Sequence, residues 1–227
     1  MKHPLGAFLL FTLLCHFQSG CCCASGQKIR NILPANHKSS ASASYAKHSF
    51  LELPFQENLG EVYDLRDLLL RMSKEWNISL ILGREVRGGF DISPEERKQL
   101  KNNKMRVREF LDLLYSTKKL SWTVWKNVLF VGSPIGIKSC IDSLKKPVEV
   151  FQNTRKNLDA EYYHTSLQSL VKQLSDCSDV KISVADDVHE YITMRISSIP
   201  WDQVLIGLVS LNGLQMIVSD FSVLITP

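Results

Sequence analysis

The chain is short of several residue types, and each shortage argues against a class of protein. Its 227 residues include only 11 glycines and 8 prolines, too few for a fibrous or low-complexity protein. No apolar run reaches the roughly 18 residues that a membrane-spanning helix requires, which argues against a polytopic membrane protein. The formal net charge is only +4 at pH 7, so charge alone does not indicate a nucleic-acid partner. With 44% apolar residues, the chain can instead form one ordinary domain or two small ones.

The sequence also lacks the short motifs that mark many enzyme sites. It contains no glycine-rich phosphate loop, no His-Glu-x-x-His and no Gly-x-Ser-x-Gly. The one cluster of catalytic residue types is Asp186-Asp187 followed by His189-Glu190, and its position between two predicted strands favours a solvated turn. We therefore expect a protein that is not an enzyme and that holds neither a cofactor nor a metal.

The N-terminal residues have the pattern of a secretory signal peptide, which we assign to residues 1–20. Lys2 precedes an apolar stretch from Leu5 to Phe17, and small residues follow. Four of the six cysteines lie close together here, at positions Cys15, Cys21, Cys22 and Cys23. Three consecutive cysteines are a poor disulfide framework, so one of them is a better candidate for a lipid attachment site.

The segment Gln18-Ser19-Gly20-Cys21 resembles the bacterial lipobox, although the family usually has leucine where this chain has Gln18. The resemblance implies that Cys21 is diacylated and becomes the new N-terminus. The alternative is cleavage by ordinary signal peptidase after Ala24, with Cys22 as the small residue at the minus-three position. Residues 21–49 show no helical or strand periodicity, and we predict a flexible tether there.

From residue 50 onward the hydrophobic pattern repeats once. Residues 50–134 predict a short extended segment near Leu51 to Phe55, then a helix, two strands, a second helix and a hairpin, and residues 158–227 predict the same order. The fold class is therefore α+β, with two small tandem βαββαββ domains, each with two helices packed between small mixed sheets. A linker over 135–157 joins them. The expected later strands are 78–82, 86–92, 120–125, 128–131, 180–184, 191–196, 213–218 and 222–226.

The last 36 residues resemble a known protein family. The strand Ile192-Thr193-Met194-Arg195-Ile196, the helix start at Pro200-Trp201 and the stop at Asn212-Gly213 are similar to the short N-terminal domain shared by bacterial secretins and TonB-dependent receptors. The first unit is a looser match, since no Pro-Trp pair precedes its second helix. The resemblance covers the chain from about Phe50 to Pro227, and it lies in the order of core positions rather than in any single motif.

The resemblance implies a function in the periplasm of the bacterial cell envelope. The protein would be a lipid-anchored accessory that binds other proteins of a secretion, pilus or TonB-type system. The implied partners are envelope proteins, such as a secretin or an inner-membrane assembly component, and further copies of the chain, because these domains form rings in secretins. Nucleic acid is not an expected partner.

A basic stretch supports an alternative function. Between Arg97 and Arg108 the chain has six basic residues and no acidic one, namely Arg97, Lys98, Lys101, Lys104, Arg106 and Arg108. Most of them lie in a polar insertion, Pro94 to Lys104, that predicts a surface loop. The stretch is either a solvated loop or a contact for an acidic protein or anionic lipid. The alternative function is therefore a membrane-surface or cell-wall adaptor that binds anionic polymer or lipid through residues 97–108.

Two cysteines remain after the signal segment, Cys140 and Cys177. Export permits a disulfide between them, and two buried free thiols are the alternative. For docking, a mixed sheet that ends in a hairpin leaves a strand edge open to an added strand. We place this docking surface on the second unit, with the late strand Ser222 to Thr226 as part of it.

Overall fold

The structure is a computed structural model that describes residues 49–55, 63–90, 93–101, 105–146, 151, 156–219 and 222–227. The predicted signal peptide, most of the predicted tether and Cys21 lie outside these residues. The described part is built from both helices and strands, which confirms the predicted α+β class.

The helices and strands follow one another from Ser49 to Thr226. The helices are α1 (Leu65–Glu75), α2 (Pro94–Lys101), α3 (Val107–Lys118), α4 (Pro134–Leu144), α5 (Leu167–Cys177) and α6 (Trp201–Leu211), and a short 3-10 helix spans Ser49–Glu52. The strands are β1 (Tyr63–Asp64), β2 (Ser79–Leu82), β3 (Gly89–Phe90), β4 (Ser121–Trp125), β5 (Val128–Gly132), β6 (Asn157–Ser166), β7 (Lys181–Val184), β8 (Tyr191–Pro200), β9 (Gln215–Ser219) and β10 (Ser222–Thr226).

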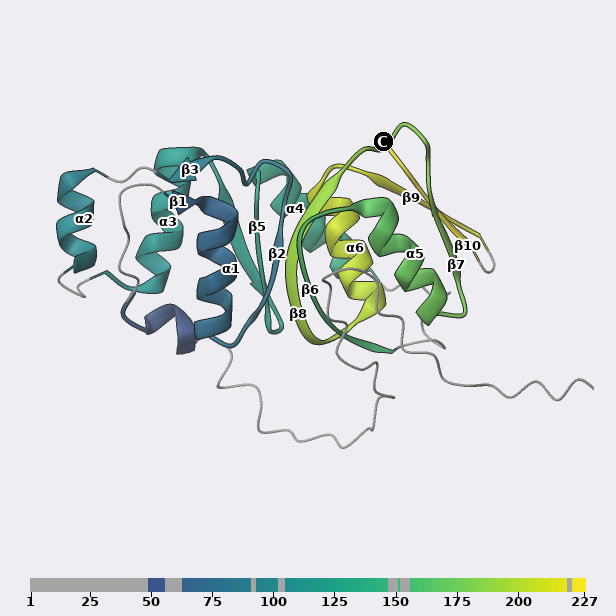
Figure 1. Ribbon diagram of the computed structural model, residues 1–227, viewed down its shortest axis with the longest axis horizontal. Coiled ribbons are helices and arrows are strands. Elements are labelled where there is room, and N and C mark those ends of the chain that lie inside the picture. The colour runs from purple at the N-terminus through teal and green to yellow at the C-terminus, as the bar shows by residue number, and fades with distance from the viewer. Residues whose placement is uncertain are drawn as a thin grey trace, which may run out of the picture.

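A five-stranded sheet at the centre of the molecule combines strands from both halves of the chain. Its order is β4-β5-β2-β8-β6, with β2 parallel to β5 and antiparallel to β8. Helices α1 and α3 cover one face, and α4, α5 and α6 cover the other (Figure 1). A three-stranded sheet of order β7-β10-β9 lies beyond α5 and α6, and β1 pairs with β3 in a small sheet of their own (Figure 1).

The middle strands of the central sheet are buried on both faces. In β2, Leu80 and Leu82 belong to the core against α1 and α3, whereas Ile81 belongs to the core against α5 and α6. Successive side chains of a strand point to opposite faces, so a strand with helices on both sides is apolar at most positions. The one polar residue of β2, Ser79, is buried and exchanges hydrogen bonds with the backbone of Ser197. This burial explains the largely apolar run that indicated a strand at residues 78–82.

The two halves pair their strands in the same way. In the first half β1 is antiparallel to β3, and β5 is parallel to β2 and antiparallel to β4. In the second half β6 is antiparallel to β8, and β10 is parallel to β7 and antiparallel to β9. The pairing of β2 with β8 then joins the halves into one sheet.

Three segments that are helical in the structure were predicted otherwise. The predicted surface loop at Pro94 to Lys104 contains α2, and the predicted linker at 135–157 contains α4. The extended segment predicted near Leu51 to Phe55 begins as the 3-10 helix. Helices α2 and α4 both have start signals in the sequence. Ser93 and Glu96 form a reciprocal capping box before α2, and the Ser133 hydroxyl accepts a hydrogen bond from the Gly136 amide at 3.2 Å, ahead of Pro134 in the first turn of α4.

Candidate protein-docking surface

The structure corrects the role that we predicted for the strand Ser222 to Thr226. This strand, β10, has the predicted bounds, but it is the central strand of its sheet and pairs with β7 on one side and β9 on the other. It therefore has no open edge to which another strand can add. A parallel partner reached by a long crossover cannot be recognised from local periodicity, which is why the sequence did not reveal it. The edges of this sheet are β7 and β9.

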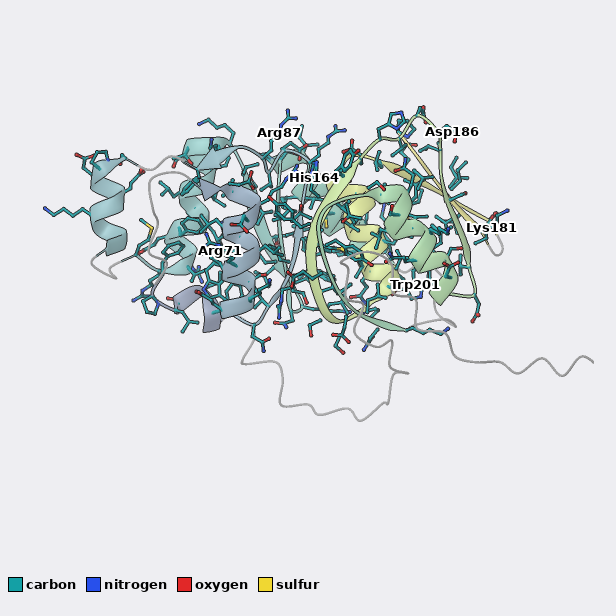
Figure 2. The ribbon with its side chains drawn as sticks, in the orientation of Figure 1. Arg71, Arg87, His164, Lys181, Asp186 and Trp201 are labelled. Carbon is teal, nitrogen blue, oxygen red and sulfur yellow. The ribbon has the colours of Figure 1, made fainter. Side chains whose placement is uncertain are left out.

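The outward face of the β7-β10-β9 sheet is exposed and partly apolar. Val223 and Ile225 are buried against the helices, whereas Leu224 between them is 38% exposed. Leu224 lies opposite Ile217 of β9, which is 58% exposed, and opposite Ser183 of β7. This face forms the end of the molecule farthest from α2 (Figure 1), where Lys181 begins β7 (Figure 2). Two apolar side chains on neighbouring strands thus meet solvent together.

The equivalent face in the first half is covered. Phe130 of β5 lies opposite Ile81 of β2, as Leu224 lies opposite Ser183, and both Phe130 and Ile81 are buried in the core shared with α6. Gly207 of α6 lies so close that a Cβ atom there would be 2.7 Å from the Phe130 ring. The same sheet architecture therefore packs against a helix in one half and meets solvent in the other.

The six predicted basic residues do not form one free basic patch in the described part of the chain. Arg106 and Arg108 both pair with Glu52, and the Arg108 Nη2 to Glu52 Oε1 distance is 3.1 Å. Lys98 is exposed on α2. The side chains of Arg97 and Lys101, and all of Lys104, lie outside the described residues. Glu52 therefore neutralises much of the charge at the start of α3.

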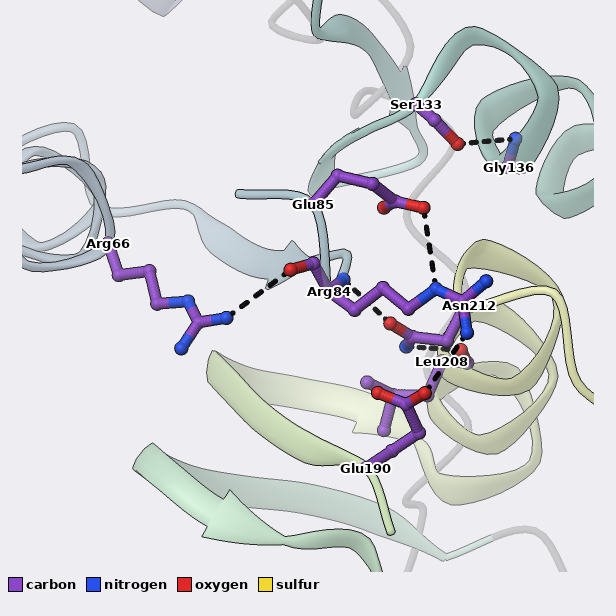
Figure 3. Close-up of polar contacts among 8 residues, drawn as sticks. All are labelled: Arg66, Arg84, Glu85, Ser133, Gly136, Glu190, Leu208 and Asn212. Atoms are coloured by element: carbon purple, nitrogen blue, oxygen red, sulfur yellow. Dashed lines mark hydrogen bonds and ion pairs between the residues drawn. The ribbon is translucent and has the colours of Figure 1, made fainter. Parts of the chain in front are cut away.

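A polar cluster joins the two halves where β2 ends, and sequence reasoning did not find it (Figure 3). The Arg84 guanidinium donates to Glu190 at 3.1 Å, and the Arg84 amide donates to the buried side chain of Asn212 at 2.7 Å. Arg66 Nη1 lies 3.0 Å from His164 Nδ1 at the same seam. Glu190, which we predicted in a solvated turn, thus forms an ion pair across the halves. The cluster links the two halves through hydrogen bonds and an ion pair.

Arg195 of β8 makes a further contact across the halves. Its guanidinium donates to the carbonyl oxygens of Ile78 at 2.8 Å and Ser73 at 3.3 Å, beside the C-terminal end of α1. A cation is favourable there because the last carbonyl groups of a helix carry partial negative charge. Within the described residues no three His, Cys, Asp or Glu side chains gather closely enough to hold a metal ion. None of the helices in that part of the chain has the length and apolar character to cross a bilayer.

Cys140 is a free thiol, fully buried on the inner side of α4. The free Cys140 thiol does not support the predicted Cys140 to Cys177 disulfide, and the side chain of Cys177 lies outside the described residues. Burial raises the pKa of the Cys140 thiol from 9.0 to about 12. The thiolate, which is the reactive form, is therefore scarce in the folded protein at neutral pH.

This burial has a measurable consequence for pH stability. Because the folded thiol has the higher pKa, the unfolded chain loses the Cys140 proton near pH 9 while the folded chain keeps it. The contribution of the protonated Cys140 thiol to the free energy of unfolding is present below pH 9. It falls between pH 9 and about 12, by up to about 1.4 kcal/mol per pH unit. We expect urea unfolding of Cys140→Ala to depend less steeply on pH in this window than that of the parent chain. Equal slopes would contradict the assignment.

The chain matches no protein-family model. No curated protein matches it either.

Proposed function

We propose that this protein is a lipid-anchored accessory of the bacterial cell envelope that binds another protein of a secretion, pilus or TonB-type system through the β7-β10-β9 sheet. The observation that carries the proposal is the exposed pair Leu224 and Ile217 at the centre of the outward face. Single exposed apolar residues are ordinary on protein surfaces. Two adjacent ones favour a docking site, particularly here, because the equivalent face of the sheet in the first half is buried. The resemblance of the last 36 residues to the secretin and TonB receptor domain supports a partner in the envelope.

The surface is suited to reversible binding. Around the two apolar side chains lie Ser183, Gln215, Ser219 and Thr226, all of which can be hydrated when no partner is bound. A small apolar centre with a polar rim is typical of interfaces that form and separate. The covered face of the first half, with Ile81 and Phe130, is the contrasting case of a permanent contact.

The adaptor function based on residues 97–108 has less support. Of the basic residues whose side chains are described, Arg106 and Arg108 are bound to Glu52, so an anionic polymer would have to compete with a carboxylate for them. The short 3-10 helix holds Glu52 beside the start of α3. We therefore do not adopt this function.

The proposal predicts that Leu224→Lys weakens partner binding without unfolding the protein. Leu224 is partly exposed, so a lysine there can extend into solvent, but in a complex its charge would be desolvated against an apolar partner. We expect the full mature chain, purified from its native membranes after chemical cross-linking, to retain a defined envelope protein. Leu224→Lys should retain at least about tenfold less of this envelope protein than the parent chain does, as expected when an apolar residue at an interface centre is lost.

Tyr115→Lys is the matched control, because Tyr115 on α3 is 56% exposed and lies in the other half of the molecule. It should leave the captured protein unchanged, and circular dichroism of both variants should match that of the parent. Capture that is equal for Leu224→Lys and Tyr115→Lys would show that this sheet face is not the docking surface. If the parent chain is found outside the membrane fraction, the proposed lipid anchor is wrong.

A further inference from the structure

The two larger sheets have four edge strands, β4, β6, β7 and β9, and three of them carry features that prevent pairing with another chain. Strand β6 is irregular, with register shifts between Leu158 and Ala160 and between Tyr162 and Thr165. Strand β7 begins with the exposed Lys181, and the amide of Ile182 donates to the Ser175 hydroxyl at 3.2 Å, which occupies part of its open edge. Bulges, lysines and side-chain capping are common means of protecting an edge.

Strand β4 is protected in a different way. Trp122 and Val124 pack on the core that contains α1 and α3, and Trp125 packs on the core that contains α5 and α6. Lysines also lie at both ends of the strand, with Lys119 before it and Lys126 in the hairpin turn. A second β4 would bring these lysines close to one another or to the neighbouring helices.

Strand β9 has neither the register shifts of β6 nor the lysines that lie at β4 and β7. Its sequence, Gln-Met-Ile-Val-Ser, contains neither a charged residue nor a proline. It pairs with β10 over five consecutive residues without a register shift. Ile217 is 58% exposed and Val218 is 36% exposed. A regular, uncharged and partly apolar edge is the kind that adds another strand.

We propose that two copies of this chain pair through β9, antiparallel and related by a two-fold axis at Ile217. In this register Ile217 faces the same residue of the second copy, Met216 faces Val218, and Gln215 faces Ser219. Apolar residues thus meet apolar ones and amide meets hydroxyl, without like charges in the paired strands. A pairing with its own copy through one patch closes into a dimer and does not propagate into a fibre.

The molecule already contains an antiparallel pairing between the edges of its two halves. Strand β8 adds to β2 in the same chain, with Leu80, Ile81 and Leu82 opposite Arg195, Met194 and Thr193. The β9 pairing would extend the three-stranded sheet to six strands in the same manner. It would also place the outward Leu224 and Ile217 of both copies in one continuous apolar row. Such an interface is small, so we expect a dissociation constant in the micromolar range or weaker.

This proposal goes beyond the binding of an envelope protein, and its first test is cross-linking of single cysteines. The full chain serves as the parent, with serine in place of Cys15, Cys21, Cys22, Cys23 and Cys177. Directly opposite residues of antiparallel strands have Cα atoms roughly 4.5 to 5.5 Å apart, within reach of a short bismaleimide. We expect Ile217→Cys to give a covalent dimer and both the parent and Tyr115→Cys to give none.

The register is tested with two further variants. Two copies of Ser219→Cys would place their thiols about 14 Å apart along the strands and should cross-link poorly, whereas a mixture of Gln215→Cys with Ser219→Cys should cross-link well. Sedimentation of the unmodified full chain from micromolar to millimolar concentration should show a monomer–dimer equilibrium that Ile217→Lys abolishes and Tyr115→Lys preserves. A chain that stays monomeric, or Ile217→Cys that cross-links no better than Tyr115→Cys, would overturn the β9 pairing. Leu224→Lys lies off this edge, so a failed docking test leaves the dimer test unaffected.

Discussion

Replacing Gly136 by valine is expected to lower the free energy of unfolding by about 3 kcal/mol. Gly136 lies in the first turn of α4, where the helix crosses the end of α6. A Cβ atom on Gly136 would lie 2.5 Å from the backbone oxygen of Leu211, closer than real Cβ contacts allow. Backbone of a buried helix cannot move aside as a flexible side chain can, so the two helices would have to separate.

Urea unfolding followed by circular dichroism measures this effect, and Ser139→Val on the exposed side of α4 is the matched control. Alanine at Gly136 should have a smaller effect, because it improves helix propensity by about 1 kcal/mol while still clashing. If Gly136→Val and Ser139→Val unfold at the same urea concentration, α4 does not pack on α6. The predicted linker would then be a linker after all.

Replacing Trp201 by alanine is expected to cost about 3 to 5 kcal/mol of stability. Trp201 is only 2% exposed and is the first residue of α6, inside the core that α5, α6 and β8 share (Figure 2). Its ring packs edge-on against Phe151, with ring centroids 4.9 Å apart. Truncation would leave a cavity beneath the start of the helix and remove the partner of Phe151.

Trp122→Ala is the comparison, because Trp122 is half-buried and its indole N–H donates to Asp112 near the surface. We expect it to cost clearly less than Trp201→Ala, and Trp201→Phe to recover part of the lost stability. Thermal unfolding monitored by circular dichroism gives all three values under the same conditions. Similar losses of stability for Trp122→Ala and Trp201→Ala would show that the deeper burial of Trp201 does not make it more important for the fold.

The elements with strong local patterns were predictable from the sequence. Strand β10 has the predicted bounds, and the short, largely apolar run at residues 78–82 indicated β2, which is buried on both faces. Helices α2 and α4 were missed although Ser93 and Ser133 each precede a proline in a typical N-terminal cap. The polar composition of α2 and the position of α4 between two repeats outweighed these signals in the interpretation.

The pairing of distant strands was not predictable in this way. The pattern of β8 shows that one face is apolar, but it does not show that Arg195 turns toward α1 of the other half. For the same reason the docking surface was placed on β10, whose sequence does not reveal that β7 and β9 flank it. Exposure of Ile217 and Leu224 depends on what covers a sheet, which is a property of the assembled fold.

The shared central sheet also affects the order in which the chain becomes stable during synthesis. The first half emerges from the ribosome with Ile81, Val128 and Phe130 on a sheet face that only the later α6 and its neighbours cover. The edge of β2 likewise stays unpaired until β8 has been made. The nascent first half therefore exposes part of an apolar face and an open strand until β8 and α6 have been made, the interval in which a chaperone is most useful.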